Sequence, residues 1–427
     1  MAENGSVAQG GGLTGVNPGR LFLASRVSLI STSVVFGVMS SIIPQLTKAY
    51  SLSDAQAGWI GGATLWGFTI AIWIFGPMCD KIGMGLLMRV AMFCHLIGPL
   101  VMMFAEKLTP SNPFIALFVG GLIMALGNGT VQGVVNPLVT TIFPDESTRV
   151  QKMNLLHMWF PGGIAIGGVL SFLIDKMGIS AEAAFTAWQM KLVLVLIPTV
   201  AYGILFTGQK FPKTEQAESG QSFGDMCSGT FGTLAFWLLF IAMGISASIE
   251  LGPGTWMTKA MTESMGKAMP SLGDGAGVLV LVYTSVLVMV MRLFAGSLAS
   301  KISPIGMLLL SAVLSGVGLF GLTKVQGGGL ILVLATVYAV GYCYFWPTTL
   351  GVTSMWVRKG GSLALSIVNG WGNAAVGLIA APAMGFISDK NGGGTEGMMV
   401  SFRYVAASAV VLLVIYGVLA VSNKKNA

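Results

Sequence analysis

The chain has 427 residues, of which 54% are hydrophobic and only 9% are charged. Soluble domains carry about a quarter charged residues, so this composition excludes a soluble globular protein and indicates an integral membrane protein. The net charge of +7 is small for this length and does not indicate a nucleic-acid partner. In a membrane protein, lysine and arginine instead report which loops face the cytoplasm.

Hydropathy predicts twelve transmembrane helices, each long enough to cross about 30 Å of hydrocarbon. The first six are expected at residues 21–47, 54–78, 83–105, 113–142, 153–176 and 187–208. The second six are expected at residues 231–260, 275–300, 304–323, 329–357, 362–387 and 398–421.

The expected domains follow from these spans and from the polar segments between them. The glycine-rich N-terminal segment lacks the basic and apolar regions of a signal peptide, so we expect a cytoplasmic tail. The predicted units are 1–20 (N-terminal tail), 21–208 (first six-helix lobe), 209–230 (cytoplasmic linker), 231–421 (second six-helix lobe) and 422–427 (C-terminal tail). Basic residues concentrate on one side of the spans, which predicts a cell (inner) membrane protein with both termini cytoplasmic.

The two halves of the sequence repeat at an offset of 210 to 220 residues. Segment 76–82, after the second span, matches 296–302 after the eighth, and the Asn-Pro pair at 136–137 corresponds to the Trp-Pro pair at 346–347. A parallel duplication of six helices is typical of carriers whose site lies between two lobes. The expected fold class is all-α integral membrane, with twelve transmembrane helices in two pseudo-symmetric six-helix lobes.

The loop after the second predicted span carries the pattern Gly-x3-Asp-Lys-x-Gly, followed by an arginine. Its residues are Gly76, Asp80, Lys81, Gly83 and Arg89. The pattern resembles the signature of the major facilitator superfamily. We expect Asp80 to act as a cytoplasmic latch that pairs with a basic group or a helix N-terminus, and both glycines to permit a tight turn. A charged loop that only obeys the positive-inside rule is the alternative.

Three amides, Asn128, Gln132 and Asn136, lie four residues apart in the otherwise apolar stretch 114–142. At helical spacing they share one face, and each unpaired amide in hydrocarbon is costly. They should therefore face a protein interior or a watery cavity. Amides both donate and accept hydrogen bonds and so suit sugar hydroxyls; the alternative is that they bond neighbouring helices together.

Glu250 follows nineteen largely apolar residues and directly precedes the helix-breaking sequence Gly-Pro-Gly at 252–254. A break at membrane depth would free backbone carbonyls for a cation or for sugar hydroxyls. We expect Glu250 to bind substrate and to be the coupling residue, with a sodium ion or a proton as the coupling ion. The alternatives are a hydrated position at the membrane boundary or a pair with a structural arginine.

Further residues are expected to contact the substrate. Asn369 and Asn373 repeat the four-residue spacing in the eleventh predicted span and could close the site from the second lobe, with helix packing as the alternative. One aromatic of the dense stretch 342–346 is expected to touch substrate. The remaining candidates are Trp66, Asn154, His157 and Trp256.

No nucleophile–base pair or metal constellation appears in the sequence. The four cysteines have no paired spacing, and two histidines are too few for a metal cluster. We therefore expect no enzyme, no metal site and no cofactor other than a coupling ion.

Segments 44–58, 136–146, 154–163 and 250–256 together resemble the fucose–proton symporter family, in the branch of sodium-dependent glucose transporters and bacterial sugar carriers. Members that couple to protons carry an acid four residues before the proline of helix 1 and another four before the asparagine of helix 4. Those positions here hold Ser40 and Gln132. Neither side chain titrates, which disfavours a proton mechanism through these two positions.

The resulting hypothesis is a secondary transporter that moves a hexose or similar neutral sugar by alternating access, coupled to sodium or protons. An uncoupled sugar facilitator and an exporter of amphipathic drugs or lipids are the alternatives. A neutral substrate is favoured because the cavity is expected to hold amides, aromatics and one acid, with Arg292 placed toward the cytoplasmic end in the second latch. The expected partners are a small polar substrate and the bilayer, with no nucleic acid, and the expected functional unit is a monomer.

Overall fold

The structure is a computed structural model that describes residues 14–179, 184–268, 276–325 and 328–424. Every regular element in these ranges is a helix. Among the described residues, eleven helices are long and apolar enough to cross a membrane, and a pair bent by 61°, α13 and α14, supplies a twelfth span. The predicted all-helical fold with twelve spans is confirmed.

The N-terminal lobe contains the helices from α1 to α9. Their bounds are α1 (Pro18–Ala49), α2 (Asp54–Phe75), α3 (Cys79–Ile82), α4 (Met84–Met103), α5 (Ala105–Leu108), α6 (Pro113–Ile142), α7 (Glu146–His157), α8 (Trp159–Lys176) and α9 (Ala187–Phe206). Capping side chains define the N-termini of two of these helices: Asn17 caps α1, and Ser53 with Gln56 forms a capping box on α2. Helix α6 packs against α2 and α4, and α1 packs against α8 and α9.

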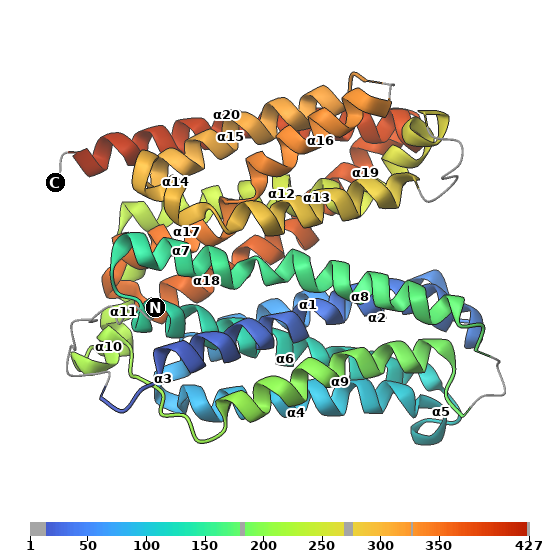
Figure 1. The fold of residues 1–427 in the computed structure, drawn as a ribbon, viewed down its shortest axis with the longest axis horizontal. Helices are drawn as coiled ribbons and strands as arrows, with labels where there is room; N and C mark the ends of the chain where they lie inside the picture. The colour runs from blue at the N-terminus through green and yellow to red at the C-terminus, as the bar shows by residue number, and fades with distance from the viewer. Residues whose placement is uncertain (1–13, 180–183, 269–275, 326–327, 425–427) are drawn as a thin grey trace, which may run out of the picture.

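The C-terminal lobe contains the helices from α12 to α20. Their bounds are α12 (Leu234–Ala268), α13 (Ala276–Arg292), α14 (Ala295–Ile302), α15 (Pro304–Leu322), α16 (Gly328–Tyr342), α17 (Phe345–Trp356), η3 (Arg358–Gly360), α18 (Gly361–Ala375), η4 (Val376–Ala380), α19 (Ala381–Lys390) and α20 (Gly394–Lys424). Figure 1 shows the lobes as two layers of roughly parallel helices. Helix α1 begins and α20 ends at the same end of the molecule, which we call the terminal end (Figure 1).

Prolines interrupt two spans near the middle of the molecule. The helix breaks between α7 and α8 lie just before Pro161, and the break between α16 and α17 lies just before Pro347. A proline has no N–H, so the carbonyl four residues earlier loses its helical hydrogen bond. The freed carbonyls are those of His157 and Cys343, and both take part in the site described below.

Helix α12 corrects one prediction. The expected break at 252–254 is wrong, because α12 continues through Pro253 to Ala268. Pro253 still deprives the Ile249 carbonyl of its helical donor. The Tyr338 hydroxyl replaces that donor, with a hydrogen bond of 2.6 Å to the Ile249 carbonyl, so α16 satisfies the defect that the proline creates.

A segment with two short helices, α10 (Glu215–Glu218) and α11 (Phe223–Phe231), connects the lobes at the terminal end. Thr214 donates hydrogen bonds from its backbone N–H, at 3.0 Å, and its hydroxyl, at 2.5 Å, to the carboxylate of Asp80. On the second lobe, Glu215 pairs with Arg358 at 2.7 Å. Asp80 thus engages the cap of α10 in the linker rather than a basic side chain. Lys81 and Arg89, the basic residues of the motif, are exposed.

The two glycines at equivalent positions of the repeat are contact points between the lobes. A Cβ on Gly76 would overlap the Ser366 hydroxyl of α18, and a Cβ on Gly296 would lie 2.7 Å from the Gln151 side chain of α7. Gly76 has helical backbone angles, so it serves close packing and not the predicted turn. Gly83 does form a turn, with a φ of 97° that favours glycine.

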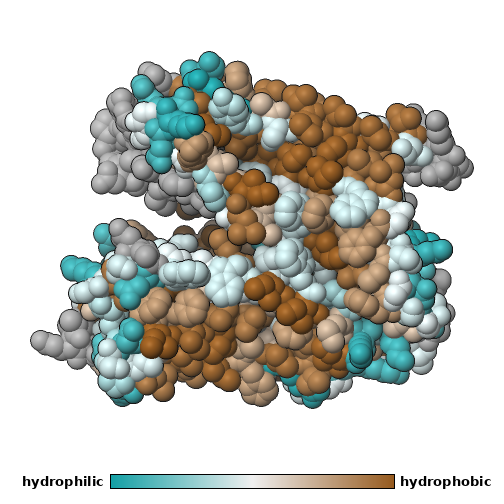
Figure 2. Space-filling view, turned by 180° about the vertical axis from the view of Figure 1, so that it is seen from behind, coloured by the Kyte–Doolittle hydropathy of each residue, from teal (hydrophilic) through white to brown (hydrophobic). Residues whose placement is uncertain are grey.

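The opposite end of the molecule has a different shape. Figure 2 shows a hollow between the two lobes at the edge away from the terminal end. At the terminal end, α2 packs on α18, and α7 packs on α14 and α17. The lobes are therefore closed against each other at the terminal end and parted at the opposite end.

Candidate functional site

A small polar cavity lies between the two lobes. It is lined by Gln132, His157 and Phe160 from the first lobe and by Glu250, Leu251, Arg292, Trp346 and Asn373 from the second. Its volume is about 20 Å³, close to the space that one water molecule occupies. Its walls carry hydrogen-bonding groups that bond to each other across the lobes, so a ligand larger than water must separate these groups.

An amide bridge joins α6 of the first lobe to α18 of the second. The Asn369 Nδ2 donates to Gln132 Oε1 at 2.9 Å, and the Trp346 indole N–H donates to Asn369 Oδ1 at 2.8 Å. Gln132 is 3% exposed and Asn369 is 1% exposed. Asn373 lies one turn further along α18 and lines the cavity. The structure therefore brings together five of the residues that the sequence nominated, from both lobes: Gln132, His157, Glu250, Asn369 and Asn373.

Arg292 forms a second bridge, and its position corrects another prediction. It is 2% exposed and lies at the central cavity, not in a latch at the terminal end. Its Nη2 pairs with Glu250 Oε1 at 2.9 Å. Glu250 is therefore paired with an arginine, which is one of the alternatives that the sequence left open, and the premise that the cavity lacks an arginine is wrong. The cavity wall therefore carries one positively charged and one negatively charged side chain, which are paired with each other.

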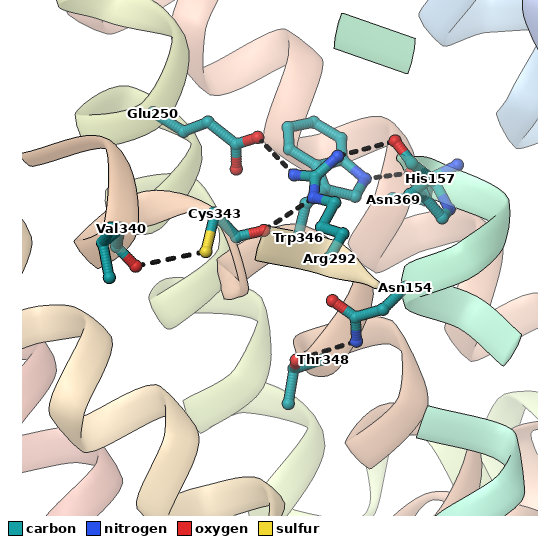
Figure 3. A network of polar contacts seen from close by, with 9 residues as sticks. All are labelled: Asn154, His157, Glu250, Arg292, Val340, Cys343, Trp346, Thr348 and Asn369. Atoms are coloured by element: carbon teal, nitrogen blue, oxygen red, sulfur yellow. Dashed lines mark hydrogen bonds and ion pairs between the residues drawn. The ribbon is translucent and has the colours of Figure 1, made fainter. Parts of the chain in front are cut away.

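The other two nitrogens of the Arg292 guanidinium each donate to a backbone carbonyl that a proline sets free (Figure 3). Nη1 donates to the His157 carbonyl at 2.6 Å, and Nε donates to the Cys343 carbonyl at 2.7 Å. Pro161 and Pro347 lie four residues after these carbonyls, which is the spacing at which a proline removes the helical donor. The guanidinium is thus held by the backbone of both lobes.

Asn136 and Asn154 flank the cavity on the first lobe. His157 Nε2 bonds to Asn136 Oδ1 at 3.0 Å, and because an amide oxygen only accepts, Nε2 carries the proton. Asn154 donates to the Val150 carbonyl at 2.9 Å and lies 3.4 Å from the Thr348 hydroxyl of α17. Both asparagines connect helices, and neither lines the central cavity.

Asn128 points to a different place. Its Oδ1 bonds to His95 Nε2 at 2.8 Å, and His95 Nδ1 lies 3.1 Å from the Tyr202 hydroxyl. Both His95 and Asn128 are fully buried inside the first lobe, away from the residues that line the cavity. The three amides of the predicted stripe therefore bond to three different helices, α4, α18 and α7.

Two other candidates lie elsewhere or outside the described side chains. Trp66 packs against Phe118 within the first lobe, with ring centroids 6.3 Å apart. The side chain of Trp256 lies outside the part of the chain whose side chains the structure describes.

Several residues of the site were not nominated from the sequence. Arg292 was assigned to another region, and Phe160 and Leu251 were not singled out. The signal for Arg292 is an arginine within one apolar span and an acid within the preceding one, which is a pattern of buried pairing. Lys191 was also missed: its Nζ is fully buried and bonds to Asp175 and Ser41, each at 2.8 Å, in the first lobe.

Buried polar atoms without a partner occur at the cavity and on the helices beside it. Among the described residues, Glu250 Oε2, Asn136 Nδ2 and Asn154 Oδ1 have no hydrogen-bond partner. Buried polar groups are normally satisfied, and leaving one unpaired costs about 1–3 kcal/mol. Of these three residues only Glu250 lines the cavity, so its Oε2 is free to bind a ligand, a proton or water without breaking an existing bond.

A larger cavity of about 340 Å³ lies between the central site and the terminal end. It is lined by Pro137 and Thr140 of α6 and by Ser362 and Leu365 of α18, and the linker residues 212–218 form its outer wall. The same two helices thus line both cavities.

Residues 22–323 match the sequence model of the Major Facilitator Superfamily. The chain belongs to this superfamily. Its members are membrane transporters, and the relatives of the chain are transporters rather than enzymes. The multi-pass topology and the predicted superfamily are thus confirmed.

One relative matches over most of its length. The L-fucose–proton symporter of Escherichia coli is 22% identical over 377 residues, which cover 82% of this chain and 83% of that protein. The chain spans about half or less of the length of several other curated relatives.

Solved structures show the same fold. The fucose symporter in its outward conformation superimposes with a TM-score of 0.73 at 19% identity, covering 92% of this chain and 97% of that chain. The proton–xylose symporter bound to a bromodeoxyglucose also gives a TM-score of 0.73, at 14% identity, covering 93% and 94% of the two chains.

Proposed function

We propose that the chain is a secondary transporter of a hexose or similar neutral sugar, working by alternating access. The observation that carries the proposal is the cavity between the lobes, at whose wall Gln132 accepts a hydrogen bond from Asn369 of the other lobe, a bond that sugar hydroxyls can replace. Amides match hydroxyls because both donate and accept, and Trp346 and Phe160 offer apolar faces for the C–H side of a sugar ring. The similarity to a fucose symporter supports the sugar class.

The proposal places ion coupling at Glu250. Ser40, which stands where proton-coupled members carry an acid, is exposed and bonds to the Phe36 carbonyl of its own helix at 2.9 Å. Gln132, at the second such position, does not titrate. Glu250 is the acid that lines the central cavity, and its Oε2 has no partner among the described residues. A proton or a sodium ion at this oxygen would weaken the hold of Glu250 on Arg292.

The membrane orientation and the oligomeric state of the protein are proposed on similar grounds. We place the terminal end in the cytoplasm of a cell (inner) membrane, because the linker and the basic residues gather there. One chain contains both lobes and the cavity between them, so we propose that it functions as a monomer. The hollow of Figure 2 then faces outward.

The amide bridge can be tested with two matched variants of one helix. Gln132→Ala removes the acceptor that meets Asn369, whereas Asn128→Ala removes an amide that bonds to His95 outside the cavity. We expect Gln132→Ala to weaken hexose binding by roughly tenfold, because about one hydrogen-bonding group to the sugar is lost. Asn128→Ala should change affinity little. Binding of labelled D-glucose, D-galactose and L-fucose to the purified protein measures both, and equal losses would contradict the site.

Closure of the terminal end can be tested at Gly76. Gly76→Ala adds a Cβ that overlaps Ser366, and a packed interface transmits such a clash rather than absorbing it. We expect the transport rate to fall about tenfold, the equivalent of roughly 1.4 kcal/mol. The double variant Gly76→Ala/Ser366→Gly should recover most of the rate. Gly168→Ala, at a glycine with open space around it, is the control, and equal losses in both single variants would contradict the interpretation.

A further inference from the structure

The guanidinium of Arg292 does not depend on Glu250 for its position. Two of its nitrogens bind the carbonyls of His157 and Cys343, which have no helical donor because prolines follow them at the critical spacing. Only Nη2 is directed to Glu250 Oε1. If Glu250 lost its charge, the arginine would stay in place with one N–H group directed at the cavity wall.

Glu250 is held less firmly than its partner. Its carboxylate binds Arg292 through Oε1 and lies beside the backbone N–H of Trp346, and Oε2 is buried without a hydrogen bond of normal geometry among the described residues. The charge on the cavity wall is therefore balanced while Glu250 is ionised and becomes positive when Glu250 is neutral. An unpaired buried arginine is strongly unfavourable, so the neutral form of Glu250 creates a demand for an anion at Arg292 Nη2.

We propose that this site, besides a neutral sugar, binds a sugar acid when Glu250 is protonated. This inference rests on the proposed sugar function and extends its substrate class. The carboxylate of the ligand takes the place of Glu250 Oε1 on Arg292, while the hydroxyls meet Gln132 and Asn369. One proton on Glu250 accompanies one carboxylate, so the loaded site has the same net charge as the empty site with Glu250 ionised.

Other titratable groups near Glu250 have fixed partners in this arrangement. Tyr338 donates to the Ile249 carbonyl, and Cys343 Sγ contacts the Val340 carbonyl. His157 bonds to Asn136 through Nε2, and Tyr342 lies beside Tyr338 with ring centroids 4.6 Å apart. His157 is the other group whose protonation would add positive charge, so the test must separate it from Glu250.

The test compares hexoses with the matching uronates on the purified full-length protein. D-glucose and D-galactose are titrated against D-glucuronate and D-galacturonate, with the wild type at pH 7.5 and 5.5 and with Glu250→Gln at pH 7.5. We expect Glu250→Gln to raise uronate affinity roughly tenfold to a hundredfold over the wild type at the same pH, as a charged hydrogen bond requires. Glu250→Asp, which keeps the charge, should retain the hexose preference.

The outcomes separate this inference from the proposed function. The inference is overturned, and the sugar function stays intact, if the wild type binds hexoses but uronates bind neither to Glu250→Gln nor to the wild type at pH 5.5. No binding of either class by any protein would overturn the proposed function. If Glu250→Gln does not fold, the wild type decides: uronate binding at pH 5.5 that is absent at pH 7.5 supports the inference, and absence of uronate binding at both pH values overturns it. A third result would also overturn the inference: His157→Gln abolishes uronate binding at pH 5.5, and Glu250→Gln does not bind uronate at pH 7.5. Protonation of His157, not of Glu250, would then control uronate binding.

Discussion

Replacing Glu250 by glutamine is expected to abolish ion-driven accumulation of the sugar while leaving downhill exchange. Glutamine keeps the shape of the side chain but neither titrates nor attracts a cation. One coupled charge driven by 100 mV is worth about 2.3 kcal/mol, which sustains accumulation of about 50-fold. We expect the variant to fall from such a ratio to simple equilibration. Uptake into proteoliposomes under an imposed gradient measures the ratio directly.

Two comparisons give this prediction its control. Glu250→Asp should retain coupling, because it keeps the carboxylate near Arg292 with one methylene fewer. Counterflow of labelled sugar against unlabelled sugar should continue in Glu250→Gln, since exchange needs no net movement of the coupling ion. Unchanged ion-driven accumulation in Glu250→Gln would remove this residue from the coupling mechanism.

Replacing Arg292 by methionine is expected to destabilise the protein more than any other change at the site. The variant leaves the Glu250 carboxylate buried without its cation and leaves two carbonyls without a donor. Removing one partner of a buried ion pair costs about 3–5 kcal/mol. We therefore expect a much lower midpoint of thermal unfolding for the purified protein in detergent, together with loss of transport.

The double variant Glu250→Gln/Arg292→Met provides the control. Removing both charges eliminates the unpaired carboxylate, so its stability should recover toward the wild type, although the two carbonyls remain unsatisfied. Arg292→Lys should fall in between, because lysine keeps the charge but loses the fork of donors that binds both carbonyls. A double variant no more stable than Arg292→Met would contradict the pairing of these residues.

The fold was largely predictable from the sequence because the bilayer imposes length and composition on every span. Each of the twelve expected segments contains a helix, and caps such as Asn17 and the Ser53–Gln56 box mark the starts. The match between segments 76–82 and 296–302 also predicted the pseudo-symmetry of the two lobes. The glycines that begin these segments, Gly76 and Gly296, each contact the other lobe. The predicted break of α12 failed because Tyr338 supplies the donor that Pro253 removes.

The candidate site was predicted only in part. Helical spacing places Asn128, Gln132 and Asn136 on one face but does not say which helix lies opposite each of them. The structure gives each amide a different neighbour, and only Gln132 meets the second lobe at the cavity. Partners between distant segments depend on packing, which periodicity does not encode.

The position of Arg292, in the second lobe, could not be predicted from the sequence for the same reason. Hydropathy located the arginine near the end of a predicted span and so suggested a boundary position. Its depth is decided by the bend of 61° between α13 and α14 and by two carbonyls whose availability depends on Pro161 and Pro347. Those prolines are visible in the sequence, but their meeting at one arginine is a property of the three-dimensional fold.

The most direct test of the account is uptake of labelled D-glucose, D-galactose and L-fucose into proteoliposomes that contain the full chain. Uptake is compared without a gradient, with an inward sodium gradient and with an inward proton gradient. The account predicts saturable uptake of at least one hexose and accumulation above equilibrium with one of the two ions. Absence of saturable hexose flux under all three conditions would contradict the sugar transporter proposed here.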